Sequence, residues 1–233
     1  MNIAIVLSGG VGTRMGLSTP KQYIEVKGQP ILAYTLDTLQ KHLDIDRIQI
    51  VANKEWYKEI EKWVGDKFAG FSEPGKNRQL SILNALNDIM GYAKDSDNVL
   101  VQDAVRPLTS SETIHSCLEG LKAHDGVMPA LPMKDTVYIG ENGQIESLLD
   151  RSKVIAGQAP EAFRLGSYYQ ANLALLPDRI LEINGSAEPA ILAGIDVGYI
   201  SGDEDNFKIT TRNDLLRFEQ IISQKDACFS ETK

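Results

Sequence analysis

The sequence contains few of the residues that form disulfides, bind transition metals or span membranes. Among its 233 residues there are two cysteines, Cys117 and Cys228, too few for a disulfide framework. The three histidines, His42, His115 and His124, lack the spacing of metal ligands. No run approaches the ~20 apolar residues of a membrane helix. We therefore expect no disulfide framework, no histidine metal site and no membrane partner.

The charge and composition bear on the partners of the protein, its location and its number of domains. A formal net charge of −8 argues against the phosphate backbone of a nucleic acid as partner. The chain starts directly with a strand-like segment instead of a basic and apolar signal, so we expect a cytoplasmic protein. With 42% hydrophobic residues, no internal repeat and no low-complexity linker, residues 1–233 are expected to form one domain.

Apolar strand patterns alternate with amphipathic helix patterns along the chain. This alternation predicts an α/β fold with a single, doubly wound, mostly parallel sheet covered by helices on both faces. The expected strands are 3–7, 47–52, 99–102 and 198–201, and the expected helices are 31–43, 55–64, 78–92, 111–123, 165–176 and 212–223. Ligands of such sheets bind at the carboxyl ends of the strands, where Asp103 follows a central strand.

A glycine-rich turn follows the first strand. Gly9, Gly10 and Gly12 allow a phosphate chain to approach main-chain N–H groups. Two cations, Arg14 and Lys21, come shortly after and can add charge-assisted contacts. The turn therefore predicts a phosphate-binding loop.

Two common kinds of phosphate-binding loop do not fit the spacing. The dinucleotide fingerprint needs a third glycine three residues after Gly12, where this chain has Met15, and Gly16 comes one residue late. A P-loop needs a Gly-Lys pair that neither Gly9 nor Gly10 has at the required distance. The spacing thus argues against a nicotinamide or flavin enzyme and excludes a P-loop NTPase.

The loop resembles the signature of nucleotidyltransferases that activate sugar and polyol phosphates, Gly-x-Gly-x-Arg-Met followed by Pro-Lys. The ending Pro20-Lys21-Gln22-Tyr23 is similar to the branch that contains the methylerythritol-phosphate and ribitol-phosphate cytidylyltransferases. Five further blocks follow in the order of that family: Arg78-Gln79-x-Ser81, Asp103-Ala104-Val105-Arg106-Pro107, Lys134-Asp135-Thr136, Gln158-x-Pro160 and Asn206-Phe207-Lys208-Ile209-Thr210. The resemblance spans nearly the whole chain and implies the Rossmann-like fold of the nucleotidyltransferases.

The resemblance implies a reaction and assigns roles to residues. The resembled enzymes join the phosphate of a polyol phosphate to the α-phosphorus of CTP and release pyrophosphate. Arg14, Lys21 and Lys208 are the expected catalytic cations. The expected nucleotide-binding residues are Ser8, Gly9, Gly10, Gly12, Thr13, Gly75, Arg78, Ser81, Asp103 and Ala104. A purine is expected to be too large for the base pocket.

Metal and acceptor sites follow from the same resemblance. Asp103 is expected to hold Mg²⁺ bound to CTP, with Asp205 as a second candidate ligand, because magnesium binds one or two carboxylates plus substrate phosphates. The expected acceptor-binding residues are Arg106, Lys134, Thr136 and Arg151. Arg106 has two roles open to it, support of Asp103 or contact with the acceptor.

One segment, about residues 134–157, interrupts the α/β alternation. The strand-like runs 136–139 and 145–149 flank Asn142-Gly143, the strongest short hairpin signal. A two-stranded ribbon is poorly stable alone, so it packs either on its own subunit or on another. In the resembled family it is an arm that embraces a second subunit and helps complete the partner's acceptor pocket. We therefore expect a homodimer.

The chain departs from the methylerythritol enzymes where the acceptor is expected. It reads Asn184-Gly185-Ser186-Ala187 where they usually carry Thr-Asp-Asp-Ala, and Gln158-Ala159-Pro160-Glu161 where they carry Gln-Thr-Pro-Gln. Gln102 also stands where a histidine commonly precedes the aspartate. We therefore expect an alditol phosphate such as ribitol 5-phosphate as acceptor, for a CDP-activated unit of a surface polymer.

Three alternatives stay open from the sequence. The first is the isoprenoid-precursor enzyme acting on methylerythritol 4-phosphate. The second is a nucleotide-binding regulatory homologue without turnover, which has no need of the full cationic set present here. The third is a sugar-1-phosphate nucleotidyltransferase that uses another base.

Overall fold

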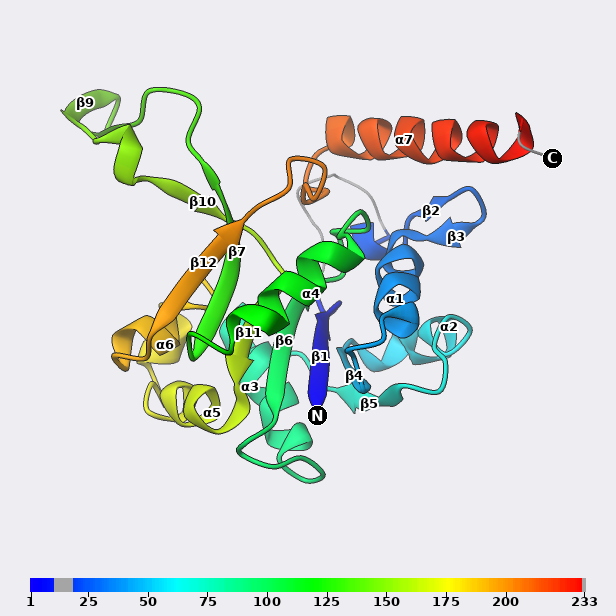
Figure 1. Cartoon of the computed structure of the whole chain (residues 1–233), viewed down its shortest axis with the longest axis horizontal. Coiled ribbons are helices and arrows are strands. Elements are labelled where there is room, and N and C mark those ends of the chain that lie inside the picture. Colours follow the sequence, from blue (N-terminus) through cyan, green and yellow to red (C-terminus); the bar gives the residue numbers. More distant parts are fainter. Residues whose placement is uncertain (11–18, 232–233) are drawn as a thin grey trace.

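The described residues fold into a mixed, mostly parallel eight-stranded sheet with helices on both faces (Figure 1). The structure is a computed structural model that describes residues 1–10 and 19–231, with the backbone alone for 225–231. The strand order is β10-β7-β11-β6-β1-β4-β5, and β12 pairs with β7. The strands are β1 (Asn2–Leu7), β4 (Arg47–Val51), β5 (Phe68–Ser72), β6 (Asn98–Asp103), β7 (Gly126–Pro132), β10 (Ile155–Gly157), β11 (Glu161–Arg164) and β12 (Val197–Ser201).

The centre of the sheet is parallel. Strand β1 pairs with β4 and with β6 in parallel, and β4 pairs with β5 in the same sense. Strand β11 is antiparallel to both β6 and β7, and β10 is antiparallel to β7. In the β1–β6 register Leu7 lies opposite Asp103, so these two strands end together and deliver their next residues to one edge.

Helices cover both faces of the sheet. Helices α1 (Ile31–Lys41) and α4 (Ser111–Gly120) pack on one face, and α3 (Arg78–Ile89), α5 (Leu165–Leu173) and α6 (Glu188–Leu192) on the other. The remaining elements are α2 (Tyr57–Ile60), α7 (Arg212–Glu231), the 3-10 helices η2 (Lys21–Tyr23), η3 (Lys54–Trp56), η4 (Arg151–Lys153) and η5 (Arg179–Leu181), and a small sheet of β2 (Glu25–Val26) with β3 (Gln29–Pro30). None of the helices in the described part is long and apolar enough to cross a membrane.

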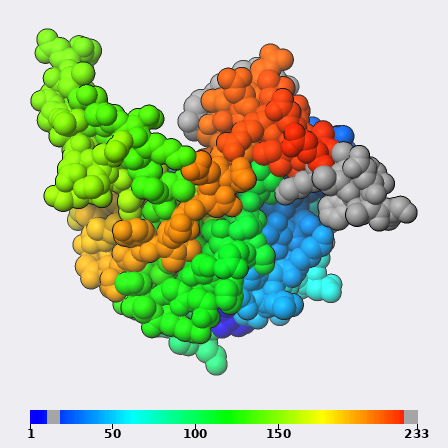
Figure 2. Space-filling view, turned by 45° about the horizontal axis from the view of Figure 1, so that its top comes forward, coloured from blue at the N-terminus to red at the C-terminus, as the bar shows by residue number. Residues whose placement is uncertain are grey.

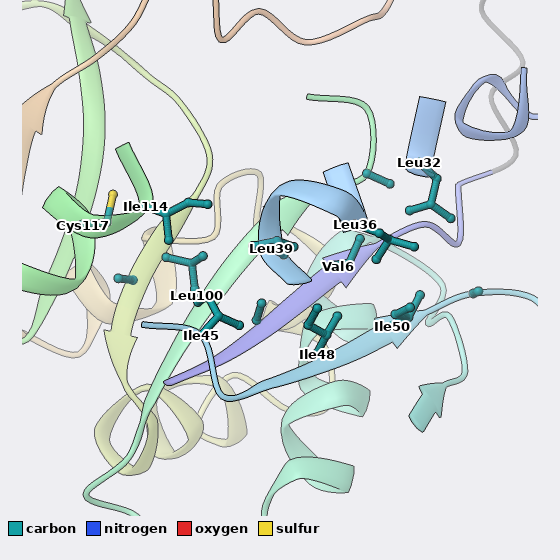
Figure 3. Close-up of a cluster of buried hydrophobic side chains, with 14 of the residues drawn as sticks. Val6, Leu32, Leu36, Leu39, Ile45, Ile48, Ile50, Leu100, Ile114 and Cys117 are labelled. Atoms are coloured by element: carbon teal, nitrogen blue, oxygen red, sulfur yellow. The ribbon is translucent and has the colours of Figure 1, made fainter. Parts of the chain in front are cut away.

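The alternation of side chains along β1 divides the core into two layers. Ala4 and Val6 face the cluster under α1 and α4, where Leu36 and Ile114 pack against the sheet (Figure 3). Ile3 and Ile5 face the cluster under α3 and α5. These side chains are fully buried, as expected for a parallel strand covered on both faces. The two apolar layers fix the position of the sheet edge where β1 and β6 end.

Most expected elements are present, several of them ending two or three residues earlier than expected, and the largest differences concern two helices. The helix expected over 55–64 is replaced by η3 and the four-residue α2. The last helix, expected to end at Ser223, continues as α7 to Glu231 through a polar segment for which the sequence predicts no structure. The elements without a counterpart among the predicted helices and strands include β5, β7, β10, β11, the short strands β2 and β3, and α6.

The expected hairpin is present as a separate two-stranded sheet of β8 (Tyr138–Glu141) and β9 (Gln144–Leu148). Asn142 and Gly143 both have positive φ, 50° and 80°, as a type I′ hairpin turn requires. Figure 2 shows this ribbon projecting from the body of the molecule. We call residues 134–157 the arm.

Candidate active site

A cavity of about 610 Å³ opens at the edge where β1 and β6 end. The first turn after β1, the start of α3 and the segment before α7 border it. The lining residues are Leu7, Gly9, Gly10, Lys21, Gln22, Val51, Asn53, Pro74, Gly75, Lys76, Asn77, Arg78, Ser81, Asp103, Val105 and Lys208. The cavity therefore brings together blocks that lie up to 200 residues apart in the sequence, at the position where ligands of parallel sheets bind.

Gly9 and Gly10, the described start of the glycine-rich loop, lie in one wall of the cavity. A Cβ on Gly9 would lie 2.6 Å from Cγ of Pro74, so only glycine fits there, whereas Gly10 has open space around it. The Gln22 amide fixes the loop by donating hydrogen bonds to the carbonyls of Ser8 and Gly10, both at 2.7 Å. Gln22 thus has a structural role that the motif did not reveal. The rest of the expected loop, Gly12, Thr13 and Arg14, lies outside the described residues.

Ser8 and Ala104 lie next to the cavity-lining residues and bond to Tyr23 and Leu7. The Ser8 hydroxyl donates to the Tyr23 hydroxyl at 3.0 Å, and burial raises the pKa of Tyr23 to about 12. The Ala104 N–H donates to the carbonyl of Leu7 at 3.2 Å. Both residues are buried and neither lines the cavity, so their expected contact with nucleotide stays a prediction.

Two lysines line the cavity from opposite ends of the chain. The Lys21 ammonium, on η2, donates to the carbonyl of Ile209 at 2.9 Å. The Lys208 ammonium lies 3.0 Å from Oδ2 of Asp103. Segment 208–209 therefore carries one of the lysines and supplies the carbonyl that accepts a hydrogen bond from the other. Both ammonium groups thus lie beside this segment at the cavity. The structure brings together the two lysines that the motifs predicted as catalytic.

Asp103 is the centre of a buried charge cluster. Its Oδ1 lies 3.2 Å from Nη2 of Arg78, and its Oδ2 lies 3.6 Å from Nε of Arg106 as well as next to Lys208. Burial alone would raise the pKa of this carboxyl, but the charges of Arg78, Lys208 and Arg106 hold it well below its ordinary value. Asp103 is therefore a carboxylate at any pH near neutrality.

Arg106 points inward from the cavity. Besides Asp103, its guanidinium donates to the carbonyl of Asn206. Asn206 is fully buried, and its side-chain amide donates to the carbonyl of Ala159 at 2.7 Å. Of the two roles open to Arg106, the geometry favours support of Asp103 and of the segment that carries Lys208. Gln102 contributes from beneath, with its amide donating to the Thr109 hydroxyl at 2.9 Å.

The start of α3 forms the opposite wall. The Gly75 N–H donates to the Ser81 hydroxyl at 3.0 Å, and that hydroxyl donates to the carbonyl of Asn77 at 2.8 Å. Asn77 caps α3 by accepting a hydrogen bond from the Leu80 N–H at 2.8 Å. Gly75 and Ser81, two of the residues predicted to bind the nucleotide, therefore lie in one hydrogen-bonded turn beside Arg78.

Alanine at Gly75 is expected to damage this turn. The added Cβ would lie 2.7 Å from the carbonyl carbon of Leu80 and 2.8 Å from the Ser81 nitrogen, so the backbone must shift. We expect a loss of about 1–3 kcal/mol in the free energy of unfolding, as in other overpacked sites, and weaker CTP binding. Urea unfolding and calorimetric titration measure the two effects. Gly185→Ala is the control, since a Cβ at Gly185 meets open space; equal behaviour of the two variants would contradict the prediction.

The expected acceptor residues on the arm lie apart from this cavity within one chain. Arg151 donates to the carbonyl of Lys134 at 2.7 Å, and the Lys134 ammonium pairs with Glu204. Thr136 is exposed. Arg151 lines a second cavity of about 750 Å³ at the base of the arm, together with Ser152 and Tyr199. Lys134 and Arg151 are thus neighbours, and neither lines the cavity that contains Lys21, Asp103 and Lys208.

Asp205 does not line the cavity that contains Asp103. Its carboxylate is exposed and pairs with Arg217 of α7 at 3.0 Å. Within the described residues, no group of three or more histidine, cysteine, aspartate or glutamate side chains is arranged to hold a metal ion. Among the described residues that line the cavity, Asp103 is the one carboxylate, and the metal-binding roles of Asp103 and Asp205 stay predictions.

Comparison with known proteins identifies the family of the chain. Residues 2–224 match the family model of IspD, 2-C-methyl-D-erythritol 4-phosphate cytidylyltransferase. A 2-C-methyl-D-erythritol 4-phosphate cytidylyltransferase of Rubrobacter xylanophilus is 34% identical over 227 residues, which cover 96% of each chain. A ribitol-5-phosphate cytidylyltransferase of Vibrio parahaemolyticus is 31% identical, over 97% of this chain and 98% of that protein.

A solved structure shows the same architecture. The crystal structure of the Francisella tularensis 2-C-methyl-D-erythritol 4-phosphate cytidylyltransferase superposes with a TM-score of 0.82 at 25% identity, over 94% of this chain and 98% of that one. The predicted fold and family are confirmed. The chain belongs to the 2-C-methyl-D-erythritol 4-phosphate cytidylyltransferase family, and it is accordingly a nucleotidyltransferase enzyme.

Proposed function

We propose that the protein transfers CMP from CTP to an alditol phosphate such as ribitol 5-phosphate, giving a CDP-alditol and pyrophosphate. The observation that carries this proposal is the cavity itself, where a glycine wall, Lys21 and Lys208 surround the end of β6. Such a site neutralises a triphosphate with main-chain amides and ammonium groups. The reaction belongs in the cytoplasm, where CTP is available.

The proposed chemistry needs no general base. A phosphomonoester has a second pKa of about 6, so the acceptor phosphate is already largely a dianion at neutral pH. The described residues that line the cavity include neither histidine nor cysteine, in keeping with a reaction that depends on positioning and charge. Lys21 and Lys208 are placed to stabilise the negative charge that builds up on the oxygens of the α-phosphorus.

Asp103 suits a magnesium ion that arrives with the nucleotide. It offers ionised oxygen ligands, which Mg²⁺ prefers, and its side chain is 9% exposed next to the cavity. Of its three cationic partners Lys208 is the most exposed, at 35%, and is therefore the partner most able to move away. When bound, Mg²⁺ neutralises phosphate oxygens and favours departure of pyrophosphate. Asp103 holds and orients the ion in this proposal.

The acceptor has a second candidate, 2-C-methyl-D-erythritol 4-phosphate. The relatives support it as strongly as ribitol 5-phosphate, since the Rubrobacter protein carries the first name and the Vibrio protein the second. The departures from the methylerythritol pattern at Gln102, Glu161 and residues 184–187 are the reason to place the alditol phosphate first. Within the structure Glu161 and Ser186 are buried and line neither cavity, so direct contact of these two side chains with the acceptor is not part of the proposal. The two candidates share the nucleotide, the cavity and the chemistry.

A pyrophosphate-release assay decides between the acceptors. The enzyme is incubated with CTP and Mg²⁺ and with ribitol 5-phosphate, methylerythritol 4-phosphate or glycerol 3-phosphate in turn. We expect release with ribitol 5-phosphate at the highest kcat/KM. A higher kcat/KM with methylerythritol 4-phosphate would establish the second candidate, and faster release with UTP or GTP than with CTP would overturn the proposed donor.

We also propose that the arm joins two copies of the chain into a homodimer. Apolar side chains are exposed on both of its strands: Tyr138 at 53%, Ile139 at 46%, Ile145 at 71% and Leu148 at 63%. A two-stranded ribbon with such a surface needs another surface to bury it. A dimer would also give Lys134 and Arg151 a cavity of the partner to complete.

The dimer predicts a specific response to charge on the arm. Ile145→Asp is expected to convert the protein from dimer to monomer in sedimentation velocity at micromolar concentration, because a carboxylate would be buried at the interface. Leu43→Asp is the matched control, since Leu43 is 96% exposed on the body and away from the arm. A wild-type monomer, or a dimer that survives Ile145→Asp, would contradict the proposed role of the arm.

A further inference from the structure

A buried carboxylate lies behind the cavity, and the proposed chemistry leaves it without a role. Glu161 is the first residue of β11 and pairs with Val101 of β6 in the sheet. It is 8% exposed and does not line the cavity. Because burial of a charge-bearing group is costly, a carboxyl in this position needs partners that stabilise it.

The partners of Glu161 lie on one side, toward the cavity. Its Oε1 is 3.9 Å from Nη2 of Arg78. The Ser186 side chain and the Ala187 N–H, in the loop before α6, act on the Glu161 carboxyl from the same side and lower its pKa. Burial raises the pKa of Glu161, and the charge of Arg78 opposes that rise. Glu161 therefore lies beside the guanidinium of Arg78, on the side of the loop before α6.

Arg78 is held from two directions. Its Nη2 donates to Oδ1 of Asp103 at 3.2 Å, and its Nη1 donates to the Ser186 hydroxyl. The planar guanidinium presents its N–H groups in fixed directions, so contacts on both sides determine how it lies. Asp103 is one anchor of Arg78, and Glu161 with Ser186 is the other.

The second anchor is itself rigid. The carbonyl of Ser186 accepts a hydrogen bond from the Tyr168 hydroxyl at 2.8 Å. Tyr168 belongs to a buried polar network in which the Gln79 amide donates to Asn172 at 2.5 Å and to Tyr168 at 3.3 Å. Ser186, Tyr168 and Asn172 are all fully buried. Arg78 is therefore held against a fixed part of the fold.

The charge balance around Asp103 depends on Glu161. The cluster contains three cations, Arg78, Arg106 and Lys208, and the second carboxylate beside Asp103 is Glu161. Removing the charge of Glu161 leaves Arg78 with Asp103 as its one anionic partner in the cluster. Arg78 would then move toward Asp103 and bind its Oδ1 more tightly.

We propose that Glu161 is a positioning residue, which holds Arg78 between two carboxylates and so fixes how Asp103 presents its oxygens to the cavity. This inference rests on the proposed function, because that function assigns Asp103 its role. Glu161 itself touches neither the nucleotide cavity nor Asp103. Its effect on the reaction passes through Arg78.

A reciprocal exchange of charge tests the proposal. Ser186 is the other side chain on the same face of Arg78, so a carboxylate at 186 can replace the one lost at 161. We expect Glu161→Gln to lower kcat/KM about tenfold, mainly through kcat, because a small displacement of a catalytic group has effects of this order or more. Ser186→Asp alone is expected to lower it as well, because two carboxylates then face each other. The double variant Glu161→Gln/Ser186→Asp is expected to recover to within about threefold of wild type.

A control separates this effect from simple fixing of the loop. Glu188 accepts hydrogen bonds from the N–H groups of Asn184 and Gly185, so it fixes the same loop without contacting Arg78. Glu188→Gln is expected to leave kcat/KM unchanged. An unchanged kcat/KM in Glu161→Gln, or a folded double variant no better than either single variant, would overturn the proposal.

A crystal structure of Glu161→Gln without ligands provides a readout independent of turnover. We expect the guanidinium of Arg78 to have left the Ser186 hydroxyl and moved toward Asp103; an unchanged Arg78 would overturn the proposal even if the double variant fails to fold. If wild-type protein released no pyrophosphate with any acceptor, the proposed function would fail. The position of Arg78 in the variant would still decide whether Glu161 positions it.

Discussion

Replacing Lys21 with alanine is expected to lower kcat about 10²-fold or more while KM for CTP changes far less. The ammonium of Lys21 lines the cavity and lies next to the segment that carries Lys208. An ammonium group directed at oxygens that gain charge in the transition state stabilises that state more than the bound substrate. Steady-state pyrophosphate release over a range of CTP concentrations measures both constants.

Lys122→Ala is the matched control for this prediction. Lys122 is 75% exposed and pairs with Glu119 close to the end of α4. Its removal changes the net charge of the protein by the same amount but leaves the cavity unaltered, so kcat is expected to stay at the wild-type value. A Lys21→Ala enzyme with wild-type kcat, or one affected in KM alone, would remove Lys21 from the catalytic role.

Asp103→Asn is expected to reduce both turnover and stability. The change removes the ionised ligand proposed for Mg²⁺ and leaves Arg78, Arg106 and Lys208 without their shared counter-charge. Removing one partner of a buried ion pair costs about 3–5 kcal/mol, and the partial exposure of Arg78 and Lys208 places this case at the lower end, about 3 kcal/mol. Urea unfolding at neutral pH measures the loss.

The stability effect has a predicted pH dependence. The folded-state pKa of Asp103 is held below its unfolded-state value of about 4, so its stabilising contribution is complete above that pH and is lost as the pH falls through the folded-state pKa. The difference in unfolding free energy between wild type and Asp103→Asn should therefore be full at pH 7 and smaller at pH 3. An equal difference at both values would show that the charge of Asp103 does not stabilise the fold.

The sequence predicted the central strands because they are uniformly apolar. Ile3–Leu7 and Val99–Gln102 are typical of strands buried on both faces, and both are present as β1 and β6. Strand β7 escaped prediction because Pro129 and Pro132 interrupt the apolar run and argue against a strand inside a sheet. Strand β11 has four residues and begins with Glu161, so it gives no periodic signal. Strand β11 forms because it pairs with β6 and β7, and such pairing between distant segments cannot be recognised from local sequence.

The candidate site was predictable only in part. Asp103 could be named because it ends a buried strand, and Lys21 and Lys208 because they belong to recognisable motifs. The inward direction of Arg106 depends on contacts with Asn206, a residue 100 positions away. The pairing of Asp205 with Arg217 depends on where α7 starts after the turn. The place of Glu161 beside Arg78 follows from an antiparallel strand pairing that no local pattern specifies.

We propose, above all, that the cavity at the ends of β1 and β6 binds the triphosphate. A crystal structure of the protein with CTP and Mg²⁺ tests it most directly. We expect the phosphates of CTP to lie against Gly9 and Gly10, with Lys21 and Lys208 at the α-phosphate. We expect the base to lie beside the turn 75–81. CTP bound at any other place, or phosphates out of reach of both lysines, would contradict the proposed binding of the triphosphate in this cavity.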